Sequence, residues 1–258
     1  MNNNLSKYIL ATITYYDVMD YPMTVFEIWK YLTRITNDEL RINNEADKYS
    51  LADIINELES EKLKKVIEKY RGFYFIKGRK NLVVQRIERN KISEKKLRVV
   101  VSIIKILRLV PFIKSLVIVG RLAMKNGENK SDMDILVILK SGKIFTGRAL
   151  ITLAVQLIGK RRYKEKIKDR ICLNHFITED FSVSIKDIFS ANEYAFAMPI
   201  FGSEVFRDFQ TKNIWINNFK SNYGNLKKNI LLLTLKKQQP LNPTIGSLNP
   251  FIPVLNFV

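Results

Sequence analysis

Apolar residues recur every three or four positions in three stretches near the start of the chain. This spacing gathers them on one face of a helix. The predicted helices cover residues 5–18, 25–32 and 51–62. Thr24 and Ser50 directly precede the second and third stretches, where a side-chain hydroxyl can accept a backbone hydrogen bond and begin a helix. Glu27 follows Thr24 by three residues and is placed to complete a capping box.

A short hairpin is expected after the third helix, with strands at residues 65–69 and 72–77. Three helices followed by a two-stranded wing are typical of a winged-helix domain, which we place at residues 1–80. Such domains often contact DNA through the third helix, but here that helix is acidic and would repel phosphates. Its acidic residues are Asp53, Glu57, Glu59 and Glu61. We therefore expect structural support or a protein contact rather than sequence-specific reading of DNA.

Residues 81–110 form the expected helical linker between two domains. The stretch 81–109 predicts one long helix or two joined helices, and Pro111 ends it. The second half, residues 97–109, is apolar enough to pack on the next domain. The first half carries charges that we expect to face solvent: Arg86, Glu88, Arg89, Lys91, Glu94, Lys95 and Lys96.

Two short apolar runs, at residues 116–119 and 135–139, predict buried β-strands. The second run is entered directly through Asp132 and Asp134. Because alternate residues of a strand share a face, these two side chains point the same way. Neighbouring carboxylates repel each other unless a cation lies between them. A divalent metal resolves the repulsion, and Mg²⁺ is the common choice where phosphates take part.

The remainder of this half predicts helices around one more strand. An apolar helix is expected over residues 146–158, and a strand over residues 171–178. The residues of that helix expected to be buried are Leu150, Leu153, Ala154 and Leu157. The further expected helices cover residues 185–197, 202–210, 215–219 and 225–237. The four prolines of residues 238–258 predict an irregular tail, so the second domain is placed at residues 111–237.

The chain has 258 residues and a net charge of +18, which is distributed unevenly. Residues 1–95 hold 17 Lys and Arg against 14 Asp and Glu, so the remaining residues carry +15. The densest basic run, residues 160–170, either holds a polyanion such as a triphosphate or nucleic acid, or is a solvated loop. A composition rich in lysine, asparagine and isoleucine also raises the charge without any partner. Binding of a polyanion, which includes non-specific binding of nucleic acid, stays open. The interpretation without any anionic partner stays open as well.

Cysteine and histidine are nearly absent. Cys172 is the single cysteine, so no intrachain disulfide can form, and His175 is the single histidine. A zinc site, or a Cys/His or Ser/His/Asp hydrolase triad, therefore lacks its usual residues. The polar start predicts that no signal peptide is present, and no apolar run reaches the ~18–20 residues of a membrane span. We expect a cytoplasmic protein with no membrane partner.

Gly120, a loop, and then Ser131-Asp132-Met133-Asp134-Ile135-Leu136-Val137 resemble the motif of the nucleotidyltransferase superfamily, which has the DNA-polymerase-beta-like fold. The wider chain also resembles uncharacterised bacterial proteins in which a winged-helix-like N-terminus precedes this domain. The resemblance implies an α/β (α+β) nucleotidyltransferase-like domain behind a winged-helix-like domain, with C-terminal helices. It also implies transfer of a nucleoside monophosphate from an NTP, with ATP expected, to an acceptor that is a small molecule, a protein or a nucleic acid.

Within this resemblance, Asp132 and Asp134 are the catalytic residues and the ligands of Mg²⁺ or Mn²⁺. Gly120 lets the backbone approach the nucleotide closely, and Arg121 lies near the phosphates. The expected nucleotide contacts are Gly120, Arg121, Ser131 and Arg148, the last a phosphate candidate from its place near the start of a helix.

Two features depart from the family pattern. The family's Gly-Ser is Gly120-Arg121 here, so the hydroxyl that usually meets a phosphate is missing. The third family carboxylate has no clear counterpart on the following strand. There the polar candidate is Asn174, with Cys172 on the same side and His175 packed on the opposite side. These departures leave an alternative open, in which the domain keeps its fold, loses catalysis and binds nucleotide or nucleic acid in a regulatory role.

Overall fold

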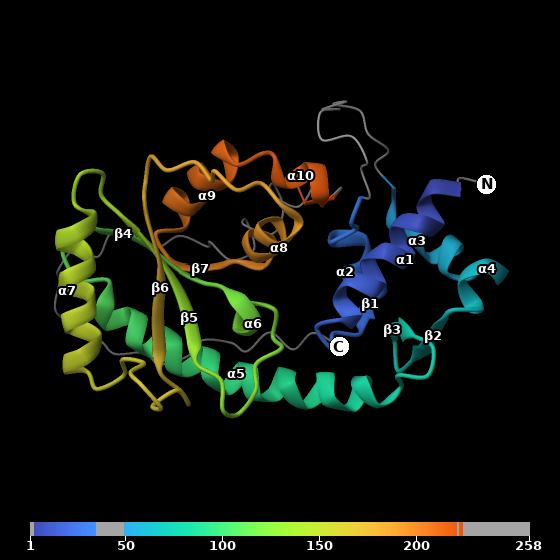
Figure 1. Ribbon diagram of the computed structural model, residues 1–258, viewed down its shortest axis with the longest axis horizontal. Helices are drawn as coiled ribbons and strands as arrows, with labels where there is room; N and C mark the ends of the chain where they lie inside the picture. Colours follow the sequence, from blue (N-terminus) through green and yellow to red (C-terminus); the bar gives the residue numbers. More distant parts are fainter. Residues whose placement is uncertain (1–2, 35–48, 221, 224–258) are drawn as a thin grey trace, which may run out of the picture. The chain divides into compact units, whose positions relative to one another are not determined.

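The computed structural model describes residues 3–34, 49–220 and 222–223 (Figure 1). All of these residues belong to one compact unit. The predicted helix at 225–237 and the irregular tail at 238–258 lie outside the described residues. Helices and strands are mixed along the described chain, so the protein is of the mixed α/β class that the sequence predicts.

The N-terminal elements include a small three-stranded sheet. Its strands are antiparallel and follow the order β1-β3-β2. In chain order the elements are α1 (Asn3–Asp17), β1 (Met23–Thr24), α2 (Val25–Lys30), α3 (Leu51–Leu58), α4 (Glu61–Lys64), β2 (Ile67–Tyr70) and β3 (Phe73–Ile76). The predicted hairpin is therefore present, and the short strand β1 adds to its β3 edge.

Side-chain caps begin these helices at the predicted places. Thr24 Oγ1 accepts a hydrogen bond from Glu27 N at 3.2 Å, and the Glu27 carboxylate accepts one from Thr24 N at 2.8 Å, which confirms the capping box. Ser50 caps α3 in the same way. The single helix predicted over residues 51–62 is wrong, because Ser60 caps a new helix and separates α3 from α4.

Helix α5 (Asn81–Leu107) is one continuous helix of 27 residues. Its first half differs from the prediction, because Arg86, Arg89 and Lys96 are only 7%, 8% and 4% exposed instead of solvated. Each is buried against a partner from another element. Arg86 Nη2 lies 2.9 Å from the carboxylate of Glu27, while Arg89 and Lys96 form ion pairs at 2.8 and 3.1 Å with residues near the second sheet. Charged residues are buried only when they are paired in this way.

The second sheet has four strands in the order β6-β5-β4-β7. Strand β5 runs parallel to β6 and antiparallel to β4, which is also antiparallel to β7. The elements are β4 (Ile113–Ile118), α6 (Gly120–Ala123), β5 (Met133–Leu139), α7 (Ile144–Leu157), β6 (Ile171–Thr178), α8 (Ile188–Phe196), β7 (Met198–Phe201), α9 (Ser203–Lys212) and α10 (Ile216–Phe219). Strand β7 was not predicted because it contains Pro199, which an edge strand tolerates since one side of its backbone has no ladder partner.

Helix α7 packs on the sheet with a different stripe from the predicted one. Its buried residues are Gly147, Ile151 and Val155. The predicted burial of Leu153 and Leu157 is wrong, since they are 54% and 79% exposed. A close approach sets the rotation of the helix: a Cβ at Gly147 would lie 2.6 Å from the side chain of Leu139. Leu139 faces the side of β5 opposite to Asp134, so α7 covers that opposite face.

An aromatic cluster links the N-terminal elements to α8. Phe196 of α8 stacks on Tyr31 with ring centroids 3.8 Å apart and meets Tyr16 and Tyr21 edge-on at 5.9 and 6.1 Å. The Tyr16 hydroxyl also donates to Asn192 Oδ1 at 2.6 Å. These contacts fix α8, which in turn contacts α6 at the end of β4.

Candidate metal centre

Two carboxylates and one thiol meet where β5 begins. Asp132 directly precedes β5, Asp134 is its second residue, and Cys172 is the second residue of β6. The parallel pairing of the two strands sets Asp134 opposite Cys172. One potential ligand atom from each of the three residues lies within 4.8 Å of the other two. The structure therefore brings the two predicted acids together and adds a thiol that the sequence analysis did not place among the ligands.

The electrostatics of this cluster favour a cation. Burial raises the pKa of Asp134, and the neighbouring Asp132 carboxylate raises it further. Burial is also the main cause that raises the pKa of Cys172 to about 11, so the free thiol is protonated at neutral pH. A bound cation would reverse both tendencies, because it stabilises the ionised form of every group that coordinates it.

Arg162 already places a positive charge against this cluster. Its Nη1 lies 2.8 Å from Asp132 Oδ2 and donates to Cys172 Sγ at 3.4 Å. The contact with Asp132 is an ion pair without the geometry of a hydrogen bond. Asp132 Oδ2 is buried and has no hydrogen-bond partner among the described residues. The backbone holds the arginine in place, because Arg162 N donates to Ile171 O at 3.0 Å. The guanidinium thus stands where a metal ion would neutralise the same acids.

We expect Arg162→Gln to bind Mn²⁺ roughly fivefold more tightly than the unmodified chain, because the internal cation no longer competes for Asp132. A partly exposed ion pair contributes up to about 1 kcal/mol, which corresponds to this factor. Calorimetric titration with Mn²⁺ measures the change. Arg121→Gln removes the same charge from an exposed pair with Glu128 and should leave the Kd unchanged. Weaker binding by Arg162→Gln would mean that the arginine positions the Asp132 carboxylate for the metal.

Gly120 supplies the space beside Asp134. Its φ is +65°, a left-handed conformation that costs other residues about 1–2 kcal/mol. A Cβ at this position would lie 2.9 Å from Asp134 Oδ2, which is closer than a carbon atom can approach without displacing its neighbour. The first residue of α6 therefore borders the carboxylate with bare backbone.

We expect Gly120→Ala to weaken Mn²⁺ binding by roughly tenfold and to lower the unfolding free energy by about 1–2 kcal/mol. The added methyl group strains the left-handed backbone and displaces the Asp134 carboxylate. Calorimetric titration and urea unfolding measure the two effects. Gly142→Ala is the matched control, because Gly142 has a φ of +73° but open space around its Cβ position. An equal loss of metal affinity in both variants would contradict the role of Gly120.

His175 and Glu193 form a pair near the acids. Along the two strands the pairing passes from Asp134 opposite Cys172 to Leu136 opposite His175, so β6 contains one extra residue here. The extra residue reverses the alternation of side chains, and the prediction that His175 packs on the opposite face is wrong. The His175 side chain is 46% exposed, and its Nδ1 lies 3.3 Å from Glu193 Oε1 of α8. This contact raises the pKa of His175, and the charge of Asp134 also raises it.

A residue other than Asn174 pairs with Asp134 across the two parallel strands. The side chain of Asn174 lies outside the described part of the structure, and the residue opposite Asp134 on β6 is Cys172. Alternation along the strand was the available signal for Cys172, since it shares a side with Asn174 in a regular strand. Neither the position of Glu193 nor the Arg162 contact has a signal in the sequence.

The other predicted nucleotide contacts do not meet the acidic pair. Arg121 Nη1 binds the Glu128 carboxylate at 2.7 Å, and the Ser131 hydroxyl donates to the Glu128 carbonyl at 2.9 Å. Arg148 lies over the ring of Phe176 at 5.1 Å, on α7. Because α7 covers the opposite face of the sheet, Arg148 is separated from the acids in this structure.

Helix α5 holds the loop that leads into the acidic pair. Ser93 Oγ accepts a hydrogen bond from Gly127 N at 2.8 Å, and Lys96 Nζ donates to the carbonyl of Ser131 at 2.5 Å. Ser131 is the residue immediately before Asp132, so a rigid helix sets the backbone at the entrance of β5. These positioning residues have no signal in the sequence, because a charged helix face is solvated unless a distant segment supplies its partners.

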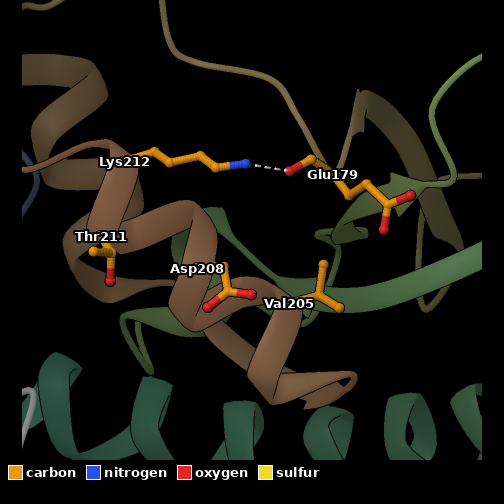
Figure 2. A pocket seen from close by; sticks show the side chains of 5 residues that line it. All are labelled: Glu179, Val205, Asp208, Thr211 and Lys212. Atoms are coloured by element: carbon orange, nitrogen blue, oxygen red, sulfur yellow. Dashed lines mark hydrogen bonds between the residues drawn. The ribbon is translucent and has the colours of Figure 1, made fainter.

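A separate hollow lies beside α9 and the end of β6 (Figure 2). It is lined by Glu179, Val205, Asp208, Thr211 and Lys212. The Lys212 ammonium donates to the backbone carbonyl of Glu179 at 3.0 Å. None of these residues belongs to the cluster of potential metal ligands, and we assign no chemistry to the hollow.

No helix in the described ranges is both long enough and apolar enough to cross a bilayer. Comparison of the chain with protein-family models, with curated proteins and with solved structures found no match in any of the three.

Proposed function

We propose that this protein is a metal-dependent nucleotidyltransferase that moves a nucleoside monophosphate from an NTP, with ATP expected, to an acceptor. The observation that carries the proposal is the convergence of Asp132 and Asp134 at the start of a buried central strand, beside the bare backbone of Gly120. The order of elements supports it. Strand β4, Gly120 and the short helix α6 precede a loop, and the acidic pair then opens β5, as in the motif that the sequence resembles.

The residues present fit a divalent cation. Two carboxylates provide hard oxygen ligands, and the buried Asp132 Oδ2 has no hydrogen-bond partner among the described residues. Arg162 shows that a positive group is accommodated there. When bound, Mg²⁺ or Mn²⁺ would neutralise the triphosphate and stabilise the charge that develops on the attacking and leaving oxygens.

The chain's own residues supply positioning and proton transfer. Gly120 lets bare backbone lie against the Asp134 carboxylate, and Arg162 belongs to the basic segment 160–170 that runs into β6. Attack by an acceptor hydroxyl needs a base, and no third carboxylate lies opposite Asp134. The His175–Glu193 pair is the nearby candidate for that base, with Glu193 orienting the imidazole through Nδ1.

Incubation of the full-length protein with ATP labelled at the α-phosphate tests the proposal. We expect label to pass to an acceptor, with release of pyrophosphate, in the presence of Mg²⁺ or Mn²⁺ and not in the presence of a chelator. Candidate acceptors are small molecules, RNA, DNA and proteins, including this chain itself. Metal-dependent ATP binding without label transfer to any of them would contradict an enzymatic role.

A second candidate function is a regulatory module that binds nucleotide or nucleic acid without catalysis. The thiol of Cys172 opposite Asp134 favours it, because the resemblance implies a third carboxylate on this strand and a thiol is what faces Asp134. Binding of nucleic acid would weaken steeply with salt and respond little to neutralising Asp132 and Asp134. Binding of metal and nucleotide by an enzyme would instead collapse when these acids are neutralised.

A further inference from the structure

We propose that Cys172 is a ligand of the metal held by Asp132 and Asp134, and that its sulfur makes the site select a softer cation such as Zn²⁺ over Mg²⁺. The inference rests on the metal site of the proposed function and adds the identity of the ion. It also revises the expectation that the chain lacks the residues for a zinc site. The expectation rests on histidines and cysteines alone, whereas the fold brings two carboxylates to the single thiol.

Strand pairing places the sulfur of Cys172 beside the two acids. Asp134 and Cys172 are opposite one another on neighbouring parallel strands, so their side chains leave the sheet on the same face. The potential ligand atoms of all three residues lie within 4.8 Å of one another. Zinc binds carboxylate oxygen at about 2.0–2.2 Å and thiolate sulfur at about 2.3 Å. One ion between the three atoms can therefore contact them all after small side-chain rotations.

Ligand chemistry then decides which ion is preferred. Thiolate is a soft ligand that favours Zn²⁺ and its spectroscopic substitute Co²⁺, whereas Mg²⁺ prefers an octahedron of hard oxygens. Three protein ligands leave a fourth position open for water or substrate, as in catalytic zinc sites. On binding, the metal–sulfur bond replaces the S–H bond of Cys172, and the proton passes to solvent. Arg162 already donates to Sγ, so the space in front of the sulfur accepts a positive group.

Titration of the full-length chain with Co²⁺ tests the metal–sulfur bond directly. Thiolate ligation gives a charge-transfer band in the near ultraviolet that carboxylate ligation does not give. Cys172 is the single cysteine, so the band cannot come from another thiol. We expect the band to saturate at one equivalent of Co²⁺, with release of a proton. Zn²⁺ should remove it at equal concentration, and Mg²⁺ only at concentrations roughly 100-fold higher or more.

Two variants separate the sulfur from the carboxylates. Cys172→Ser should lose the band and bind Zn²⁺ at least roughly tenfold more weakly, while its Mg²⁺ affinity stays within roughly twofold. Asp134→Asn should weaken the binding of both ions. Circular dichroism and thermal unfolding establish that the variants fold, and the Co²⁺ spectrum of the unmodified chain does not depend on any variant.

The possible outcomes distinguish this inference from the proposed function. Visible Co²⁺ bands without the near-ultraviolet band, or the same ion preference in Cys172→Ser as in the unmodified chain, would overturn Cys172 as a ligand and leave the metal site intact. Failure of both Co²⁺ and Mg²⁺ to bind the unmodified chain would overturn the proposed function as well.

Discussion

Replacing Asp134 by asparagine is expected to abolish nucleotidyl transfer and, at the same time, to stabilise the metal-free protein. Label transfer should fall by roughly 100-fold or more, because asparagine keeps the shape of the side chain but not the charge that holds the cation. The gain in stability follows from the position of the carboxylate. Burial and the charge of Asp132 raise the pKa of Asp134, so its ionised form is disfavoured in the folded state.

The stability effect has a defined dependence on pH. Because the pKa of Asp134 is higher in the folded than in the unfolded chain, the folded state binds more protons between the two values. The contribution of Asp134 is therefore fully present below its unfolded pKa, and the unfolding free energy falls as pH rises through the folded pKa. Asparagine removes this fall, so Asp134→Asn should gain more over the unmodified chain at about pH 7 than at about pH 4.

Thermal unfolding in the presence of a chelator at both pH values, together with transfer from labelled ATP, measures the two effects. Asp208→Asn is the matched control, because Asp208 is an exposed carboxylate on α9, in the hollow of Figure 2. It should change neither quantity. Added Mn²⁺ should raise the melting temperature of the unmodified chain and of Asp208→Asn only. Joint loss of transfer and stability in Asp134→Asn would identify Asp134 as a structural residue instead.

The acidic pair could be predicted because it depends on local sequence alone. An apolar run long enough for one strand follows Asp134, and strand alternation then sends Asp132 and Asp134 to one side. The capping box of Thr24 and Glu27 is local in the same sense, since both partners lie within one turn of a helix. The structure reproduces both features.

The surroundings of the pair could not be predicted because they depend on contacts between distant segments. One extra residue in β6 turns His175 toward the side of Asp134, and no composition rule locates such a bulge. Lys96 of α5 is buried only because the loop before Asp132 supplies its acceptors. The rotation of α7 follows from the fit of Gly147 against Leu139, which the apolar pattern of the helix does not contain.

Replacing Lys220 by methionine is expected to raise the unfolding free energy by about 1–4 kcal/mol at neutral pH and below, as for other buried charges replaced by apolar groups. Lys220 is 0% exposed, and burial lowers its pKa to about 7. Its Nζ donates to Tyr16 Oη at 3.1 Å and to Thr33 Oγ1 at 3.0 Å. Among the described residues no carboxylate forms an ion pair with it, so the charge is held by neutral groups and nearby rings.

Removal of the ammonium leaves neither buried hydroxyl without a partner. Tyr16 still donates to Asn192 Oδ1 at 2.6 Å, and Thr33 still donates to the carbonyl of Tyr31 at 3.3 Å. The cost that usually follows the loss of one partner of a buried hydrogen bond is therefore small here. Methionine is also flexible enough to fill the space of the lysine stem.

The dependence on pH distinguishes this explanation from a simple packing effect. The folded pKa of Lys220, about 7, lies below its ordinary value of 10.5, so between these values the unfolded chain holds a proton that the folded chain lacks. The unfolding free energy of the unmodified protein therefore rises with pH across this window. The difference in unfolding free energy between Lys220→Met and the unmodified protein should shrink accordingly. Urea unfolding of both proteins at several pH values between about 6 and 10 measures this difference.

Lys220→Arg should destabilise instead, because a guanidinium cannot lose its proton on burial. A Lys220→Met protein that is less stable than the unmodified chain at pH values below the folded pKa would show that the two hydrogen bonds outweigh the cost of the buried charge.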